Sequence, residues 1–130
     1  MNTKVLIPIF ISAILVLVLH LIAIAEHLYW KYWWYDNIVH FLGGITISLV
    51  VLFYLERFQF LKNTSELGYM GYGCVGALLV SFLWEFFEYS AGVSFVTANS
   101  FVLDTVLDIS TGFIGAWCAS MYAYAMRKTQ

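Results

Sequence analysis

Residues 5–25 read VLIPIFISAILVLVLHLIAIA, a run of 21 residues whose only ionisable side chain is His20. Three later stretches, 37–55, 67–84 and 109–126, have the same character and contain 18 or 19 residues each. A helix needs about 20 apolar residues to cross a bilayer. Backbone groups in lipid must be hydrogen-bonded within their own segment, so each run predicts a transmembrane helix rather than a strand.

The whole chain has the composition of a membrane protein. It has 130 residues, of which 62% are hydrophobic and 11% are charged, whereas soluble domains have about 25% charged residues. It contains one proline, and no linker or low-complexity tract interrupts it. We therefore expect a single transmembrane domain over residues 1–130, an all-α integral membrane four-helix bundle with helices at about 4–27, 36–56, 67–91 and 101–126.

The first apolar run has an alternative interpretation. Lys4, the run itself and the sequence Ala23-Ile24-Ala25 resemble a signal peptide with an A-x-A cleavage site. The run is longer than the usual apolar region of about 7–15 residues, and it contains His20. We expect a retained helix, and a cleaved leader is the alternative.

The basic residues predict the orientation. Short loops make successive helices alternate in direction, which places Lys31 on one side and five bases on the other: Lys4, Arg57, Lys62, Arg127 and Lys128. The positive-inside rule then puts both termini in the cytoplasm. With a net charge of −2, nucleic acid is not an expected partner. The expected partner is membrane lipid, and a homo-oligomer or a partner membrane protein is left open.

Acidic and histidine residues gather on the outer side of this predicted topology. Six of the eight acids and all three histidines fall there: Glu26, Asp36, Glu85, Glu88, Asp104, Asp108, His20, His27 and His40. Ionisable groups in or beside hydrocarbon are costly and mark functional sites by default. Three pairs also have helical spacing that puts both members on one face: Asp36 and His40, Glu85 and Glu88, and Asp104 and Asp108.

So many carboxylates in a low-dielectric site require protons, imidazolium or a metal ion to balance them. Carboxylates and imidazoles on facing helices are how bundle cores hold metals. We therefore predict a divalent metal site made by Asp36, His40, Glu85, Glu88, Asp104 and Asp108. Oxygen ligands suit Mg, Ca or Mn, and an imidazole adds Zn and Fe. His20 and His27 are expected outside the ligand set.

Two alternatives to the metal site stay open. Protonated carboxyls can share protons with one another and with His, Tyr or Ser, or the cluster can receive a lipid headgroup or a solute. The first function hypothesis is accordingly a metal-binding membrane protein, with an enzyme acting on a lipid or envelope substrate as one form of it. The second is a non-enzymatic membrane factor or a proton or solute carrier, and the third is a bundle whose polar cluster is structural.

Two further patterns occur near this side of the predicted bundle, one of aromatic residues and one of small residues. Three Trp and three Tyr predict an interfacial aromatic belt, with a lid over the site as the alternative: Tyr29, Trp30, Tyr32, Trp33, Trp34 and Tyr35. Small residues continue the polar helix faces and predict close helix contacts: Gly44, Ser48, Ala77, Ser81, Thr111, Gly112 and Gly115.

Residues 35–44, YDNIVHFLGG, are similar to the Y-D-x3-H-F-x2-G pattern of the YjdF family of bacterial inner-membrane proteins. The family's E-x2-E and D-T-x2-D-x6-G-A motifs match 85–88 and 104–116 in the same order. The resemblance covers about residues 30–120 and implies a multi-pass protein of the bacterial cytoplasmic membrane, without implying an activity. A more distant similarity to VanZ-like proteins runs through the same acidic and histidine positions. The family has a longer loop before the third motif than Gly92–Leu103 here.

Overall fold

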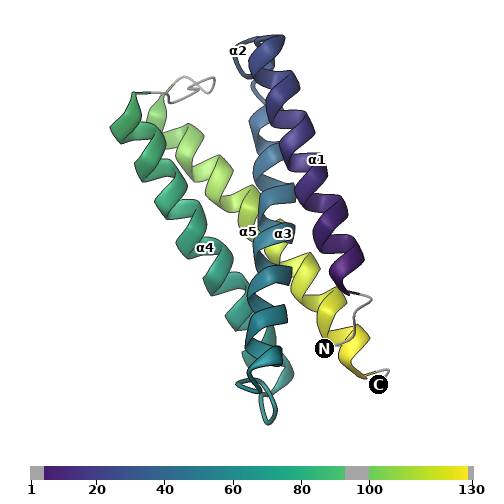
Figure 1. Cartoon of the computed structure of the whole chain (residues 1–130). Helices are drawn as coiled ribbons and strands as arrows, with labels where there is room; N and C mark the ends of the chain where they lie inside the picture. Colours follow the sequence, from purple (N-terminus) through teal and green to yellow (C-terminus); the bar gives the residue numbers. More distant parts are fainter. Residues whose placement is uncertain (1–4, 93–99, 129–130) are drawn as a thin grey trace.

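Five helices make up the part of the chain that the computed structural model describes, residues 5–92 and 100–128. They are α1 (Leu6–Ala25), α2 (Leu28–Lys31), α3 (Tyr35–Arg57), α4 (Glu66–Ala91) and α5 (Phe101–Lys128). All secondary structure in these residues is helical, and α1, α3, α4 and α5 are long and apolar enough to cross a membrane. The predicted all-α membrane bundle is thus confirmed (Figure 1).

The ends of the helices have local causes. His27 adopts a left-handed backbone with φ 56°, which separates α1 from the short helix α2; the sequence predicts a first span to residue 27 and no such helix. The Ser65 hydroxyl accepts a hydrogen bond from Gly68 N at 3.2 Å and caps α4. Gly92, with φ 66°, ends it. Residue 4 of the predicted first span and residues 93–99 of the predicted short loop lie outside the described residues.

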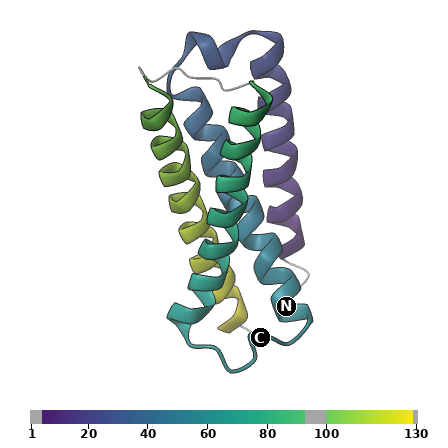
Figure 2. The ribbon, with the colours of Figure 1, turned by 90° about the vertical axis from the view of Figure 1, so that its left-hand side faces the viewer.

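Helix α3 occupies the centre of the arrangement. It packs against α1, α4 and α5, and α4 also packs against α5. The two chain ends lie at one end of the bundle, and α2 lies at the other (Figures 1 and 2). Helices α3 and α5 therefore run in the same direction, away from the α2 end, so that the first turns of both lie at that end.

The backbones of α3 and α5 touch through glycine. A Cβ atom at Gly44 would meet the carbonyl group of Gly112, and one at Gly115 would meet the carbonyl of Phe41. Further along the same seam, the Ser48 and Ser120 hydroxyls lie 2.8 Å apart. These contacts confirm the predicted close helix interface for Gly44, Ser48, Gly112 and Gly115.

Helix α1 is attached more loosely and faces lipid. It buries only Ser12 and Ala23, while Ile7, Phe10 and Leu17 are among its exposed apolar side chains. Its polar links to α3 are a 2.8 Å hydrogen bond that the Thr46 hydroxyl donates to Ser12, and a 3.0 Å bond that Tyr35 donates to the backbone of Leu19.

The end that carries the termini is held by a basic side chain. Arg127, in the last turn of α5, donates to the carbonyls of Leu61 and Lys62 at 2.7 and 3.1 Å. Its guanidinium lies 3.8 Å from Glu56 and over the ring of Tyr69. The loop between α3 and α4 is thereby fixed to the end of α5.

Gly115→Ala is expected to destabilise the protein, although alanine normally favours a helix over glycine by about 1 kcal/mol. The added methyl would strike the Phe41 carbonyl, and such overpacking costs about 1–3 kcal/mol. The measurement is thermal unfolding in detergent. The matched control is Gly71→Ala, where a Cβ meets nothing within 4 Å and the melting temperature should stay or rise. Equal melting temperatures for the two variants would contradict the glycine contact.

Candidate functional site

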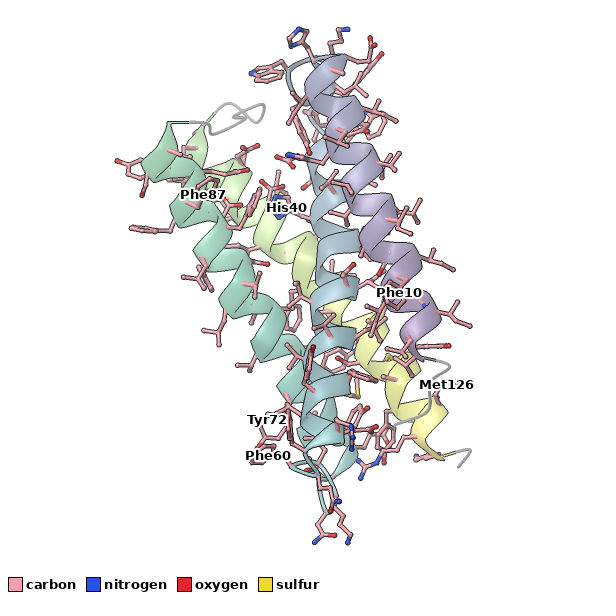
Figure 3. The ribbon with its side chains drawn as sticks, in the orientation of Figure 1. Phe10, His40, Phe60, Tyr72, Phe87 and Met126 are labelled. Atoms are coloured by element: carbon pink, nitrogen blue, oxygen red, sulfur yellow. The ribbon has the colours of Figure 1, made fainter. Side chains whose placement is uncertain are left out.

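The first turns of α3 and α5 and the last turns of α4 bring the predicted acidic residues to one end of the bundle. The carboxylates of this set are all buried, with residues 3–9% exposed: Asp36, Glu85, Glu88, Asp104 and Asp108. The His40 side chain is 9% exposed and lies between α3 and α4 (Figure 3). The six side chains thus come from three helices, two from each.

Three of the six form the tightest group. One ligand atom each of Asp36, His40 and Asp108 lies within 4.8 Å of the others. The Nε2 atom of His40 is 3.5 Å from Asp36 Oδ1, longer than an ordinary hydrogen bond of about 2.7–3.2 Å. Two ligand atoms that are each about 2.0–2.2 Å from a shared ion lie roughly 3–4.4 Å apart. The 3.5 Å separation is thus longer than a direct hydrogen bond and lies within the range of two ligands of one ion.

Glu85 extends this group from α4. Its Oε1 atom is 3.9 Å from His40 Nε2, and its side chain is 8% exposed. Thr105 donates a 2.8 Å hydrogen bond to the other oxygen, Oε2, which fixes the carboxylate. Oε1 itself is buried and accepts no hydrogen bond from the described residues. A buried acceptor without a partner costs about 1–3 kcal/mol, so this atom is suited to receive a ligand.

Glu88 and Asp104 lie outside this three-residue group. Glu88 accepts a 2.8 Å hydrogen bond from Trp84 Nε1, one turn earlier on α4. The backbone N–H of Asp104 donates to the Ser100 carbonyl at 3.1 Å in the first turn of α5. Both carboxylates are buried at the same end of the bundle.

The site gathers five buried carboxyl groups with few basic partners. The ion pairs found for Asp36 and Glu85 both involve His40, which is charged only when protonated. Arg127 and Lys128 form their ion pairs at the opposite end of the bundle. Protons or a cation must therefore balance this cluster.

Side chains beyond the predicted set position the cluster. Thr105 and Trp84 donate hydrogen bonds to the carboxylates of Glu85 and Glu88. Their positions in the sequence indicate these roles, because Thr105 lies inside the D-T-x2-D motif and Trp84 lies four residues before Glu88. The Tyr29 hydroxyl is 2.8 Å from His20 Nδ1. Burial, with the nearby Asp36 charge, raises the pKa of the Tyr29 phenol, so it stays protonated at neutral pH.

The six residues of the predicted aromatic belt differ in their exposure. Trp30, Tyr32, Trp33 and Trp34 are exposed as interfacial anchors are, whereas Tyr29 and Tyr35 are buried against α1. Glu26 and Lys31 are exposed.

A groove leads to the cluster. It has a volume of about 300 Å³, lies between α1, α3 and α4, and is partly open. Its lining includes Asp36, His40 and Glu88 from the cluster, together with His20 and Tyr29.

Residues 1–129 match a protein family described as "Predicted membrane protein (DUF2238)". The chain belongs to this family. It is the YjdF-type family that the three motifs indicate, so the resemblance is confirmed. Comparisons with curated proteins and with solved structures gave no match. What this DUF2238 protein does must therefore be argued from the geometry of its site.

In this DUF2238 protein, the Glu85→Gln variant is expected to melt a few degrees higher than the wild type when both have been treated with a chelator. The amide removes one charge from the acidic cluster and places either an oxygen or an N–H group beside His40. The measurement is thermal unfolding in detergent at neutral pH. Glu66→Gln is the control, because Glu66 pairs with Lys128 at the exposed opposite end and should matter little. A lower melting temperature for Glu85→Gln would contradict the crowding of negative charge.

Proposed function

We propose that this protein binds a divalent metal ion at the α2 end of the bundle. Asp36, His40 and Asp108 would be the first ligands and Glu85 the fourth, with Glu88 and Asp104 in the same pocket. The observation that carries the proposal is the convergence of three ligand atoms within 4.8 Å, beside the buried and unpartnered Oε1 of Glu85.

The donor set indicates which ions fit. Carboxylate oxygens with one imidazole nitrogen suit Mn, Fe or Zn, and Mg or Ca requires more oxygen ligands or water. The Thr105 hydrogen bond to Glu85 has the role of an outer partner that orients a ligand. Carboxylates from α3, α4 and α5 supply the negative charge that a divalent ion neutralises.

A metal at this place supports chemistry on a membrane substrate. A divalent ion held by Asp36, His40, Asp108 and Glu85 would supply Lewis-acid polarisation of an ester or phosphoryl oxygen, or would lower the pKa of a water molecule. The groove from the lipid side reaches Asp36 and His40, so a lipid or envelope substrate could approach the ion. We therefore favour a metal-binding membrane protein that acts on such a substrate.

A proton-sharing network is the second candidate, and specific contacts favour it. Thr105 and Trp84 already donate hydrogen bonds to Glu85 and Glu88, and His40 lies near two carboxylates. In that case the protein is a non-enzymatic membrane factor or a proton or solute carrier. Metal binding separates the two candidates.

We also propose that the chain is one transmembrane domain of a bacterial cytoplasmic membrane with both termini in the cytoplasm. Arg57, Lys62, Arg127 and Lys128 lie at the end that carries the termini, and Lys31 lies at the other. The metal site then faces the outer leaflet.

Gently purified protein should contain a divalent ion, and adding the ion back to chelated protein should raise its melting temperature. An ion at 100 times its Kd stabilises by about 2.7 kcal/mol. Asp108→Asn and His40→Ala should abolish both the bound ion and the thermal shift, while Glu66→Gln should change neither. Because the ligands must be deprotonated, the shift should fade at acidic pH. Absence of metal on elemental analysis, with no shift from Mg, Mn, Ca, Zn or Fe, would favour the proton-sharing network.

Cysteine labelling tests the orientation. In a Cys118→Ala background, Lys31→Cys should react with an impermeant thiol reagent added outside cells, and Asn63→Cys should react only after lysis. Both positions are exposed, so access rather than burial decides the result. The reverse pattern would place the metal site at the cytoplasmic face.

A further inference from the structure

The groove exists because α1 and α4 stand apart across α3. Helix α1 packs on α3, and among the described residues α1 and α4 are not one of the closely packed pairs. The space between them, about 300 Å³, is partly open. Since both walls are transmembrane helices, this opening lies at the depth of the lipid chains.

The walls of the groove change character along its length. Toward the middle of the helices the lining is apolar and includes Ala13, Val16, Ile47 and Val80. At the α2 end it becomes polar, with His20, Tyr29, Asp36, His40 and Glu88. An apolar channel at membrane depth does not hold water well, so its natural occupant is a hydrocarbon chain. The polar end then receives the headgroup of the same molecule.

The charges at the polar end select the headgroup. Asp36 and Glu88 line it, and none of the described lining residues is Lys or Arg. Trp84 fixes the Glu88 carboxylate with its indole N–H, and both side chains line the groove. An anionic headgroup would meet like charge there, whereas a primary ammonium offers three N–H donors to carboxylates.

We propose that the groove binds an ethanolamine phospholipid, with one acyl chain between α1 and α4 and its ammonium group at Glu88 and Asp36. This inference extends the proposed function and rests on it in one respect. The phosphate of the bound lipid would lie beside His40 and would contact the metal ion of the proposed site. Asp36 would contact both the ammonium group and the ion, but the ion ligands Asp108 and Glu85 do not line the groove. Glu88, the other carboxylate at the ammonium group, is not one of the four ligands proposed for the ion. Lipid binding and metal binding can therefore be lost separately.

A glycine in the lining provides the decisive variant. Gly43 faces the groove, and a Cβ atom added there meets nothing within 4 Å. Gly43→Leu should fill the groove without disturbing the fold. Gly71→Leu is the matched control, because Gly71 also has open space around it but is not a lining residue.

Native mass spectrometry of the purified protein can count lipid and metal adducts in one spectrum. Protein delipidated in detergent is mixed with phosphatidylethanolamine, phosphatidylglycerol or phosphatidylcholine. The wild type should bind phosphatidylethanolamine about tenfold better than the other two, as one charge-assisted contact implies. Gly43→Leu should lose the lipid adduct while Gly71→Leu keeps it, and Glu88→Gln should bind all three lipids about equally.

Asp108→Asn separates this inference from the proposed function. It should lose the metal adduct and keep the phosphatidylethanolamine adduct. Equal binding of the three lipids by the wild type would overturn the headgroup assignment, and unchanged lipid binding by Gly43→Leu would overturn the groove. A metal-free wild type that still prefers phosphatidylethanolamine would overturn only the metal proposal.

Discussion

The contact between the backbones of α3 and α5 is the constraint on which the site depends. The two helices run in the same direction and touch at Gly44 and Gly112. His40 lies one turn before Gly44 on α3, and Asp108 lies one turn before Gly112 on α5. The two residues therefore occupy equivalent positions next to the glycine contact. A side chain at Gly44 would strike the Gly112 backbone and separate the helices, and with them the imidazole and the carboxylate. Packing and site geometry therefore have a common cause.

The sequence predicts the fold well because the bilayer imposes it. Apolar runs of the right length define four helices, and alternation brings Asp36, Glu85 and Asp108 to one end whatever the details of packing. Helical spacing also identifies which acidic residues share a face. These arguments need no tertiary contacts, which is why the predicted spans and the observed helices differ by only a few residues.

The finer parts of the site depend on rotations and tilts of the helices, which the sequence pattern does not determine. Spacing alone treats Asp104 and Asp108 alike, but only Asp108 reaches the tight group with His40. It gives Thr105 no role, although this hydroxyl fixes Glu85. Nor does it separate Tyr29 from the exposed tryptophans, because a left-handed residue at His27 turns α2 back toward α1.

The exposed tryptophans around α2 mark the level of the membrane surface close to the site. Asp36 is in the first turn of α3, and His40 is one turn, about 6 Å, deeper. An ion held there has crossed roughly one fifth of a hydrocarbon core about 30 Å thick. A membrane potential of 100 mV then changes the energy of a divalent ion by only about 1 kcal/mol. If the proposed metal site is occupied, energising the membrane would thus change its apparent affinity for the ion only by about fivefold, and the ion concentration on the adjacent side would be the larger influence.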